Sequence, residues 1–472
     1  MPDRTKILIV TDSPVLPTGM AEATRLIFGG LLAKYTGCYE LHQLGLFQCY
    51  AVTTPQWPVY PTMTIKNRQG KLEFSAEDKH GAKTFFRLLP KVQPDIVFAF
   101  GDPQTVLYLS LPPKDRRYKL ILYINFDGLP MVPGYGDILN RADLIFTKSE
   151  FSMEVLARCM PMVEREKLGY RYSPADLERF APVPEATRAE MRQDLFPSWM
   201  PPDAFVLGWI GRNQWRKQVW LLYKVLHYLR TGEYLVCRTC GRVSPFEWDP
   251  TRQAPVNPGG LMSLVTESRP DYGHDNCGHC GSSQVEQASP FLDLFLWCHM
   301  PEEPEEAWPL RAIEEQFGLR RDRDLYYTPE HGHKSALAPE DMPMLYRIWD
   351  CLLFLSGGEG FGLPAWEAMC AAIPVIYTNY SSHAEFLGRA QAGLPVGGIL
   401  QPEPKTCIWR MVADVGQTIE AVRRLYFNRK AGRQLGENGR NFVRQFNIGT
   451  QAEAWHRTFQ KLVQPCRAMN LA

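Results

Sequence analysis

Two glutamates flank the segment of this chain that is best suited to bind a ligand. Glu359 and Glu367 are separated by seven residues and lie around the glycine-rich segment 356–362. The apolar run 351–355 predicts a buried parallel strand, and Pro364 is typical of the first turn of a helix. Glycines let a backbone approach a ligand closely, and a helix N-terminus favours an anion or a polyol. Because carboxylates accept hydrogen bonds from sugar hydroxyls, the pattern predicts a nucleotide that carries a sugar.

A second segment, upstream of the first, supplies positive charge. Residues 205–210 form an apolar run that predicts a strand, and residues 219–229 have the periodicity of an amphipathic helix. The turn between them, Gly-Arg-Asn-Gln-Trp-Arg-Lys at 211–217, contains Arg212 and Lys217. Both charged segments therefore lie between a predicted strand and a predicted helix.

Together with Ile373-Pro-Val-Ile376, these two segments resemble the signature of glycosyltransferase family 4. The resemblance implies an α/β protein with the GT-B fold, in which two Rossmann-like parallel-sheet domains face a central cleft. It also implies a retaining hexosyltransferase that takes its sugar from a nucleotide-sugar donor and needs no catalytic metal. Arg212 and Lys217 would bind the donor diphosphate, because two fixed cations stabilise the charge on that leaving group.

The resemblance also assigns roles to individual residues. The catalytic set is Asp127, Glu359, Arg212 and Lys217. The donor-binding set comes from the glycine-rich segment, the helix after it and the loop after the first strand: Glu367, Gly360, Phe361, Gly362, Leu363 and Gly19.

The first half of the chain predicts a parallel sheet covered by helices on both faces. Its strands are expected at apolar runs 7–10, 41–46, 96–100, 120–124 and 144–147. Asp127 follows the fourth run, where many members of the family carry a His that contacts the transferred sugar. Three interpretations of Asp127 remain open: it replaces that His, it acts as a base for the acceptor hydroxyl, or it caps the following turn.

The domain organisation follows from these patterns and from a proline-rich stretch. We expect an acceptor domain at 1–182, a hinge at 183–202 and a donor-binding domain at 203–446. Residues 231–290 form an insert within the donor-binding domain. A last helix within 447–472 is expected to cross back to the first domain, as in other GT-B enzymes.

The insert carries two Cys-x-x-Cys-Gly motifs, and this pattern predicts a structural Zn²⁺ site in a zinc ribbon. The four ligands would be Cys237, Cys240, Cys277 and Cys280. The chain has 12 cysteines and no secretory signal, which favours a reducing, cytoplasmic compartment and metal over disulfides. Free or redox-active thiols remain the alternative.

Composition excludes some classes of partner. The chain has 472 residues, 45% of them hydrophobic and 22% charged, with a net charge of +1. No apolar stretch is long enough to span a membrane, and no global field attracts nucleic acid or anionic lipid. Zinc ribbons often contact nucleic acid, so a modified base in DNA or RNA is one candidate acceptor. However, the insert has four basic and seven acidic residues, the wrong balance for binding phosphates. A protein or small-molecule acceptor, with the ribbon as a lid or docking finger, is equally open.

Two other functions compete with glycosyl transfer. One is a GT-B sugar-phosphate enzyme, such as an epimerase or a phosphorylase. The other is a non-catalytic module that binds nucleic acid or protein. No Schiff-base lysine motif of a pyridoxal phosphate phosphorylase is evident, and the four charged residues Glu359, Glu367, Arg212 and Lys217 speak against a non-catalytic module.

Overall fold

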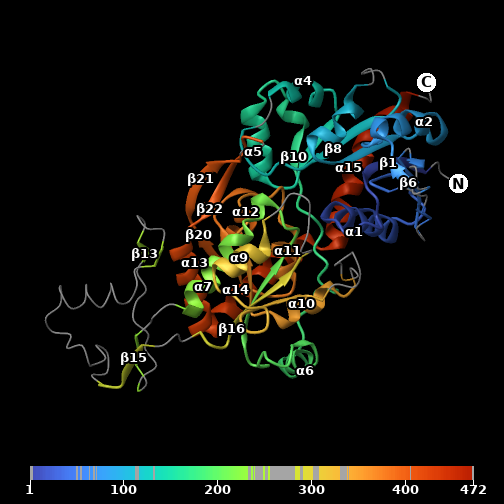
Figure 1. Ribbon diagram of the computed structural model, residues 1–472. Helices are drawn as coiled ribbons and strands as arrows, with labels where there is room; N and C mark the ends of the chain where they lie inside the picture. The colour runs from blue at the N-terminus through green and yellow to red at the C-terminus, as the bar shows by residue number, and fades with distance from the viewer. Residues whose placement is uncertain are drawn as a thin grey trace.

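The chain folds into two halves, each built around a mainly parallel sheet with helices on both faces (Figure 1). The computed structural model describes residues 4–48, 52–53, 56–62, 64–66, 70, 72–111, 116–130, 133–231, 235–237, 239, 248–249, 254–255, 282–287, 291–300, 308–329, 337, 340–403 and 406–469. The expected α/β class with two parallel sheets is confirmed, although the exact domain boundaries remain a prediction.

The first sheet has the strand order β10-β9-β8-β7-β1-β2-β4-β3. Its strands are β1 (Thr5–Asp12), β2 (Tyr39–Leu46), β3 (Val52–Thr53), β4 (Pro58–Pro61), β7 (Ile96–Gly101), β8 (Lys119–Ile124), β9 (Leu144–Thr147) and β10 (Leu168–Tyr170). Only the β3–β4 pair is antiparallel. The five predicted strands correspond to β1, β2, β7, β8 and β9.

Alternate residues of β1 face different layers, as the two-residue period of a strand requires. Ile7 and Ile9 pack with helix α1 (Gly19–Lys34), whereas Leu8 and Val10 pack with helix α2 (Ala82–Val92). Helix α5 (Glu150–Cys159) follows β9 and contributes Leu156 to the α2 layer. The sheet is therefore buried on both faces, and the ends of its strands are left to carry polar groups.

The second sheet has the order β17-β16-β11-β18-β19-β20. Its strands are β11 (Phe205–Ile210), β16 (Leu294–His299), β17 (Leu325–Tyr327), β18 (Cys351–Phe354), β19 (Val375–Thr378) and β20 (Gly393–Val396), all paired in parallel. One face packs on α7 (Val219–Thr231), α9 (Leu310–Gln316) and α13 (Val415–Phe427). The other packs on α10 (Met342–Ile348), α11 (Leu363–Cys370), α12 (Ser381–Ala390) and α14 (Arg429–Val443).

Two segments connect the halves. Helix α6 (Glu185–Leu195) lies within the expected hinge and packs on α10. Helix α15 (Ile448–Met469) follows the second sheet but packs against α1, and its Trp455 and Phe459 join the core of the first sheet. Figure 1 shows this red helix running into the half that contains β1.

Part of the insert between α7 and β16 is described. Strand β12 (Leu235–Cys237) pairs with β15 (Val285–Gln287) in an antiparallel ladder, and β13 (Trp248–Asp249) pairs with β14 (Ala254–Pro255). Cys240, Cys277 and Cys280 lie outside the described residues. Within the described part of the chain, no helix combines the length and apolar character that a membrane crossing requires.

Candidate functional site

The glycine-rich turn between β18 and α11 lies directly against the first half of the chain. A Cβ on Gly358 would collide with the backbone oxygen of Asp127, and one on Gly360 would lie 2.9 Å from Cβ of Asn125. Gly362, at the N-terminus of α11, has a φ of 94°, which favours glycine. The glycines therefore allow the two halves to approach closely, in addition to any approach of a ligand.

Glu359, one of the predicted catalytic residues, is buried in this turn with an exposed fraction of 6%. Its backbone N–H donates to Oγ of Ser381 at 2.9 Å. Its carboxylate pairs with Nζ of Lys217 and with Nη1 of Arg216, the latter at 2.9 Å. Burial opposes ionisation of this carboxyl, but Arg216 and Lys217 outweigh it and hold the pKa of Glu359 well below its ordinary value.

Lys217 reaches Glu359 from the turn after β11. The turn ends at Gln218, which has a φ of 49°, and Lys217 is buried with its amine 5.4 Å from the ring centroid of Phe354. Burial lowers the pKa of Lys217, and the charge of Glu359 acts in the opposite direction. The structure thus brings together Lys217 and Glu359, which are 142 positions apart in the sequence.

Arg216 was not among the residues predicted from the sequence, yet it is the centre of the site. Its side chain is 25% exposed, and its Nη1 donates to the backbone oxygen of Gly358 at 3.1 Å. Burial opposes its charge, but Glu359 and Asp127 raise the pKa of Arg216 above its ordinary value. The signal in the sequence was a second basic residue next to Lys217 in the same turn.

Arg212 differs from its neighbours because it is exposed. It makes no ion pair with another residue of the described chain, although it lies close enough to Asp12 for its charge to act on that carboxyl. Burial raises the pKa of Asp12 above its ordinary value, against the effects of a hydrogen bond from Thr18 and of Arg212. Arg212 is therefore a cation available to a ligand at the boundary between the halves.

Asp127 follows β8 and lies on the other side of that boundary. Its Oδ1 is 3.1 Å from Nη1 of Arg410, and its Oδ2 is 3.9 Å from Nε of Arg216. The side chain is 28% exposed. Asp102, at the end of the neighbouring β7, has its pKa raised by burial and by the charge of Asp127.

Glu367 lies in different surroundings from Glu359. Its Oε2 accepts a hydrogen bond from the hydroxyl of Tyr346 at 2.6 Å. Burial raises the pKa of Glu367 to about 7, and nearby Glu22 acts in the same direction. In the described part of the structure the two carboxylates share no hydrogen-bond or ion-pair partner, so the role of Glu367 in donor binding remains a prediction.

The remaining donor-binding candidates are packed at the same boundary. A Cβ on Gly19 would lie 3.5 Å from Cδ2 of Leu363, so the loop after β1 touches the first turn of α11. Phe361 is buried, with its ring centroid 5.1 Å from that of Trp366 and 5.2 Å from the amine of Lys148. These contacts show packing roles, and a contact with a donor stays a prediction.

Helix α12 also contacts the first half. Its Glu385 accepts hydrogen bonds from the first N–H groups of α5, at 2.6 Å from Phe151 and 3.2 Å from Glu150. Its Ser382 lies with Oγ 2.7 Å from Oγ of Ser149. An open hollow of about 520 Å³ lies beside these contacts and is lined by residues of α5 and of the segment 379–385. A carboxylate near a helix N-terminus is favourable, so these contacts hold the halves together.

The described residues contain no group of three potential metal ligands, but three of the four predicted zinc ligands lie outside them. Cys237 ends β12 opposite Val285. Thr239, which lies between Cys237 and Cys240 in the sequence, has Oγ1 2.6 Å from Oγ of Ser282, two positions after Cys280. The described residues beside the two motifs therefore lie near each other, with Cys237 opposite Val285 and Thr239 beside Ser282.

One protein family matches part of this chain by sequence. Residues 328–442, which contain Glu359 and Glu367, match the family described as glycosyl transferases group 1. No curated protein matches the chain by sequence.

Several solved structures share the fold along nearly the whole chain. Sucrose-phosphate synthase from Thermosynechococcus elongatus is 14% identical with a TM-score of 0.66, covering 98% of this chain and 100% of that one. Anabaena Alr3699/HepE in complex with UDP-glucose is 13% identical with a TM-score of 0.62, covering 97% and 100%. "Trehalose-6-phosphate from E. coli", bound with UDP-2-fluoro glucose, is 13% identical with a TM-score of 0.60, covering 97% and 99%. The family match covers residues 328–442, and the solved structures share the two-domain fold over nearly the whole chain.

Proposed function

We propose that this protein is a retaining glycosyltransferase that moves a hexose from a nucleoside-diphosphate sugar to a hydroxyl group of an acceptor. The observation that carries the proposal is the cluster of buried Glu359 and Lys217 with partly exposed Arg216, and with exposed Arg212 in the same turn. Such a cluster holds charged groups in fixed positions and excludes water, and fixed charges act most strongly in such surroundings.

The residues divide the chemistry between them. The bond between the anomeric carbon and the donor phosphate oxygen breaks, and its electron pair leaves with the nucleoside diphosphate. Arg212 and Lys217 stabilise that developing charge. The acceptor oxygen bonds to the anomeric carbon, and its proton passes to the departing phosphate or to Asp127. Glu359 orients Lys217 and Arg216 and accepts hydrogen bonds from sugar hydroxyls.

UDP-glucose is the first donor to test, because HepE binds it with the same fold. We expect the purified protein to release UDP or another nucleoside diphosphate from one member of a panel of nucleotide sugars. An acceptor panel of sugars, small alcohols, DNA and RNA then follows the formation of a new glycoside. Turnover without any acceptor would favour an epimerase or a hydrolase, and no turnover with any donor would contradict the proposal.

A structural Zn²⁺ ion is the second part of the proposal. The β12–β15 ladder and the Thr239–Ser282 contact support it, because they hold described residues next to the two cysteine motifs close to each other. Four thiolates leave no position open for a substrate, so the ion would stabilise the fold of the insert.

Metal analysis of the purified chain tests this part directly. We expect one zinc per chain, lost in Cys277→Ser/Cys280→Ser and retained in Cys407→Ser, which replaces an exposed free cysteine. A wild-type protein purified without chelator and free of zinc would contradict the site.

A further inference from the structure

A two-stranded hairpin of the second half extends to the loop that carries Asp127. Strands β21 (Gly398–Pro402) and β22 (Trp409–Ala413) are antiparallel, with Gln401 opposite Arg410. The hairpin lies between β20 and α13 in the sequence, so it interrupts the regular alternation of strands and helices. Figure 1 shows β21 and β22 in orange, next to β20.

Strand β22 is held between the two sides of the site. On one side, the N–H of Trp409 donates to the backbone oxygen of Leu129 at 2.5 Å. On the other, the N–H of Met411 donates to the oxygen of Gly357 at 2.9 Å. Gly128 leaves no room for a side chain, since a Cβ there would lie 2.5 Å from Cγ2 of Ile408. The hairpin therefore connects the Asp127 loop to the glycine-rich turn.

Arg410 is the charged residue at the centre of this connection. Its side chain is 8% exposed, and its Nη1 lies 3.1 Å from Oδ1 of Asp127 and 3.2 Å from the backbone oxygen of the same residue. Its Nη2 pairs with Oε2 of Glu403 at 3.1 Å. A guanidinium with donors in a rigid plane fixes the direction of a carboxylate better than a single ammonium group does.

These ion pairs form a continuous series from the loop of the first half to the turns of the second half. Arg410 holds one oxygen of Asp127, Arg216 faces the other at 3.9 Å, and Arg216 also pairs with Glu359. Among the described residues, the ion pair that Asp127 would keep without Arg410 is the longer one with Arg216. Because Asp127 is still partly exposed, its orientation decides how it meets an acceptor.

We propose that Arg410 is a positioning residue that fixes the Asp127 carboxylate at the site of transfer, an inference that rests on the proposed glycosyltransferase function. The hairpin belongs to the second half of the chain, yet it fixes the orientation of Asp127 in the first half. Binding of the nucleoside diphosphate does not depend on Arg410, since that ligand is held by Arg212 and Lys217.

Kinetics of three variants test the proposal with the nucleotide sugar that the wild-type protein turns over best. We expect Arg410→Ala to lower kcat by about 10- to 100-fold while KM for the donor and Kd for UDP stay within about twofold. Arg410→Lys should recover part of the loss, because it keeps the charge but loses the planar donors. Arg433→Ala, at an exposed arginine of α14, is the matched control.

A double-mutant cycle separates positioning from a general loss of structure. In an Asp127→Asn background, Arg410→Ala should cost less than about threefold further, because both changes remove the same interaction. An equal loss in both backgrounds, or wild-type activity of Arg410→Ala, would overturn the proposal.

Hydrogen exchange provides a measurement that needs no donor. We expect faster amide exchange at residues 126–129 in Arg410→Ala than in the wild type or Arg433→Ala. Unchanged exchange there would overturn the positioning role. If the wild type turns over no nucleotide sugar, the proposed function fails and the catalytic meaning of Arg410 fails with it, whereas exchange still decides whether Arg410 holds the loop.

Discussion

The two sheets have similar parallel architectures, but the turn after β11 is basic, whereas three strands of the first sheet lead into acidic residues. In the first sheet, Asp12 is the last residue of β1, whereas Asp102 follows β7 and Asp127 follows β8. After β11 the second sheet carries Arg212, Arg216 and Lys217. Topology therefore places a site at the strand ends in both halves, and the loop residues alone decide the sign of its charge. A cationic side suits a diphosphate, and a side of carboxylates suits the hydroxyl groups of an acceptor.

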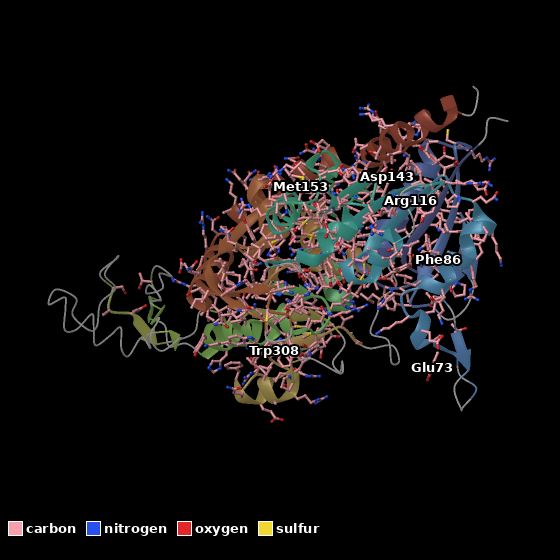
Figure 2. The ribbon with its side chains drawn as sticks, turned by 90° about the horizontal axis from the view of Figure 1, so that it is seen from above. Glu73, Phe86, Arg116, Asp143, Met153 and Trp308 are labelled. Atoms are coloured by element: carbon pink, nitrogen blue, oxygen red, sulfur yellow. The ribbon has the colours of Figure 1, made fainter. Side chains whose placement is uncertain are left out.

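Away from the boundary between the halves, side chains make contacts within one half of the chain (Figure 2). In Figure 2, Arg116 and Asp143 lie close together on the first half, where they form an ion pair. Asp143 also accepts a hydrogen bond from the backbone N–H of Leu120. Trp308, labelled on the second half, packs edge-on against Trp215 with ring centroids 4.4 Å apart. Such contacts stabilise local structure, whereas the charges at the boundary join residues of both sheets.

Of the changes considered, replacing Glu359 should cause the largest losses of stability and of donor turnover. Glu359→Ala leaves the buried Lys217 without its carboxylate partner and removes the closer partner of Arg216, which costs about 3–5 kcal/mol in the free energy of unfolding. We also expect turnover of the donor to fall by about 1,000-fold or more. Urea unfolding and nucleoside diphosphate release measure the two effects. Glu437→Ala, an exposed glutamate on α14, serves as the control.

The pH dependence of the same variant sharpens this result. The pKa of Glu359 is depressed in the folded state, so its stabilising effect is present above its unfolded value of about 4.5 and is lost as the pH falls through the lower folded value. The difference in stability between the wild type and Glu359→Ala should therefore shrink in acid. A difference that grows in acid would contradict the assignment.

Glu367 should make a smaller contribution to the pH dependence of stability, and one of opposite sign to that of Glu359. Its folded pKa of about 7 exceeds the unfolded value of about 4.5, so the folded protein holds a proton that the unfolded chain has lost. Wild-type stability should thus fall as the pH rises from about 4.5 to 7 and then stay level. Glu367→Gln should remove this slope and be more stable above pH 7 by at most about 3 kcal/mol. Thermal unfolding at pH 5 and 8 decides between this outcome and equal stability at both.

Replacing Arg212 tests whether the basic turn 211–217 binds a diphosphate, and it should have little effect on folding. Because Arg212 is exposed and unpaired among the described residues, Arg212→Ala should change the free energy of unfolding by less than about 0.5 kcal/mol. Its loss should weaken UDP binding by about 10- to 30-fold, about 1.4–2 kcal/mol, and strongly reduce transfer. Calorimetric titration with UDP checks this, and unchanged affinity would remove Arg212 from the donor site.

Replacing Asp12 should produce the smallest change, a change in the affinity for UDP. Its carboxylate lies near Arg212 and competes with a phosphate for that charge. We expect Asp12→Asn to tighten UDP binding by about threefold, since a charge contact whose partner, Arg212, is exposed contributes about 0.7 kcal/mol. The same titration measures it, with Asp137→Asn on α4 (Gly136–Leu139) as the control. Weaker binding would show that Asp12 supports the donor side.

Much of the charged cluster around Lys217 and Glu359 could be predicted from the sequence. Lys217 and Glu359 each lie between an apolar run and a helical segment, and parallel strands bring such turns to one edge of a sheet. The structure joins them in one ion pair. Arg216 was missed because the pattern gives no direction for a side chain in a turn, and only the left-handed conformation at Gln218 and the contact with Gly358 fix it.

By itself, the sequence determined the two parallel sheets, the order of their strands along the chain and the turns that carry charge. Local apolar periodicity and glycine placement encode these features within short segments. Only the tertiary structure decided which charges meet across the boundary: Arg216 and Arg410 with Asp127, and Glu367 with Tyr346 rather than with the partners of Glu359. The physical reason is that ionic contacts depend on distances of a few ångströms between segments remote in the chain, and packing of whole helices and sheets sets those distances.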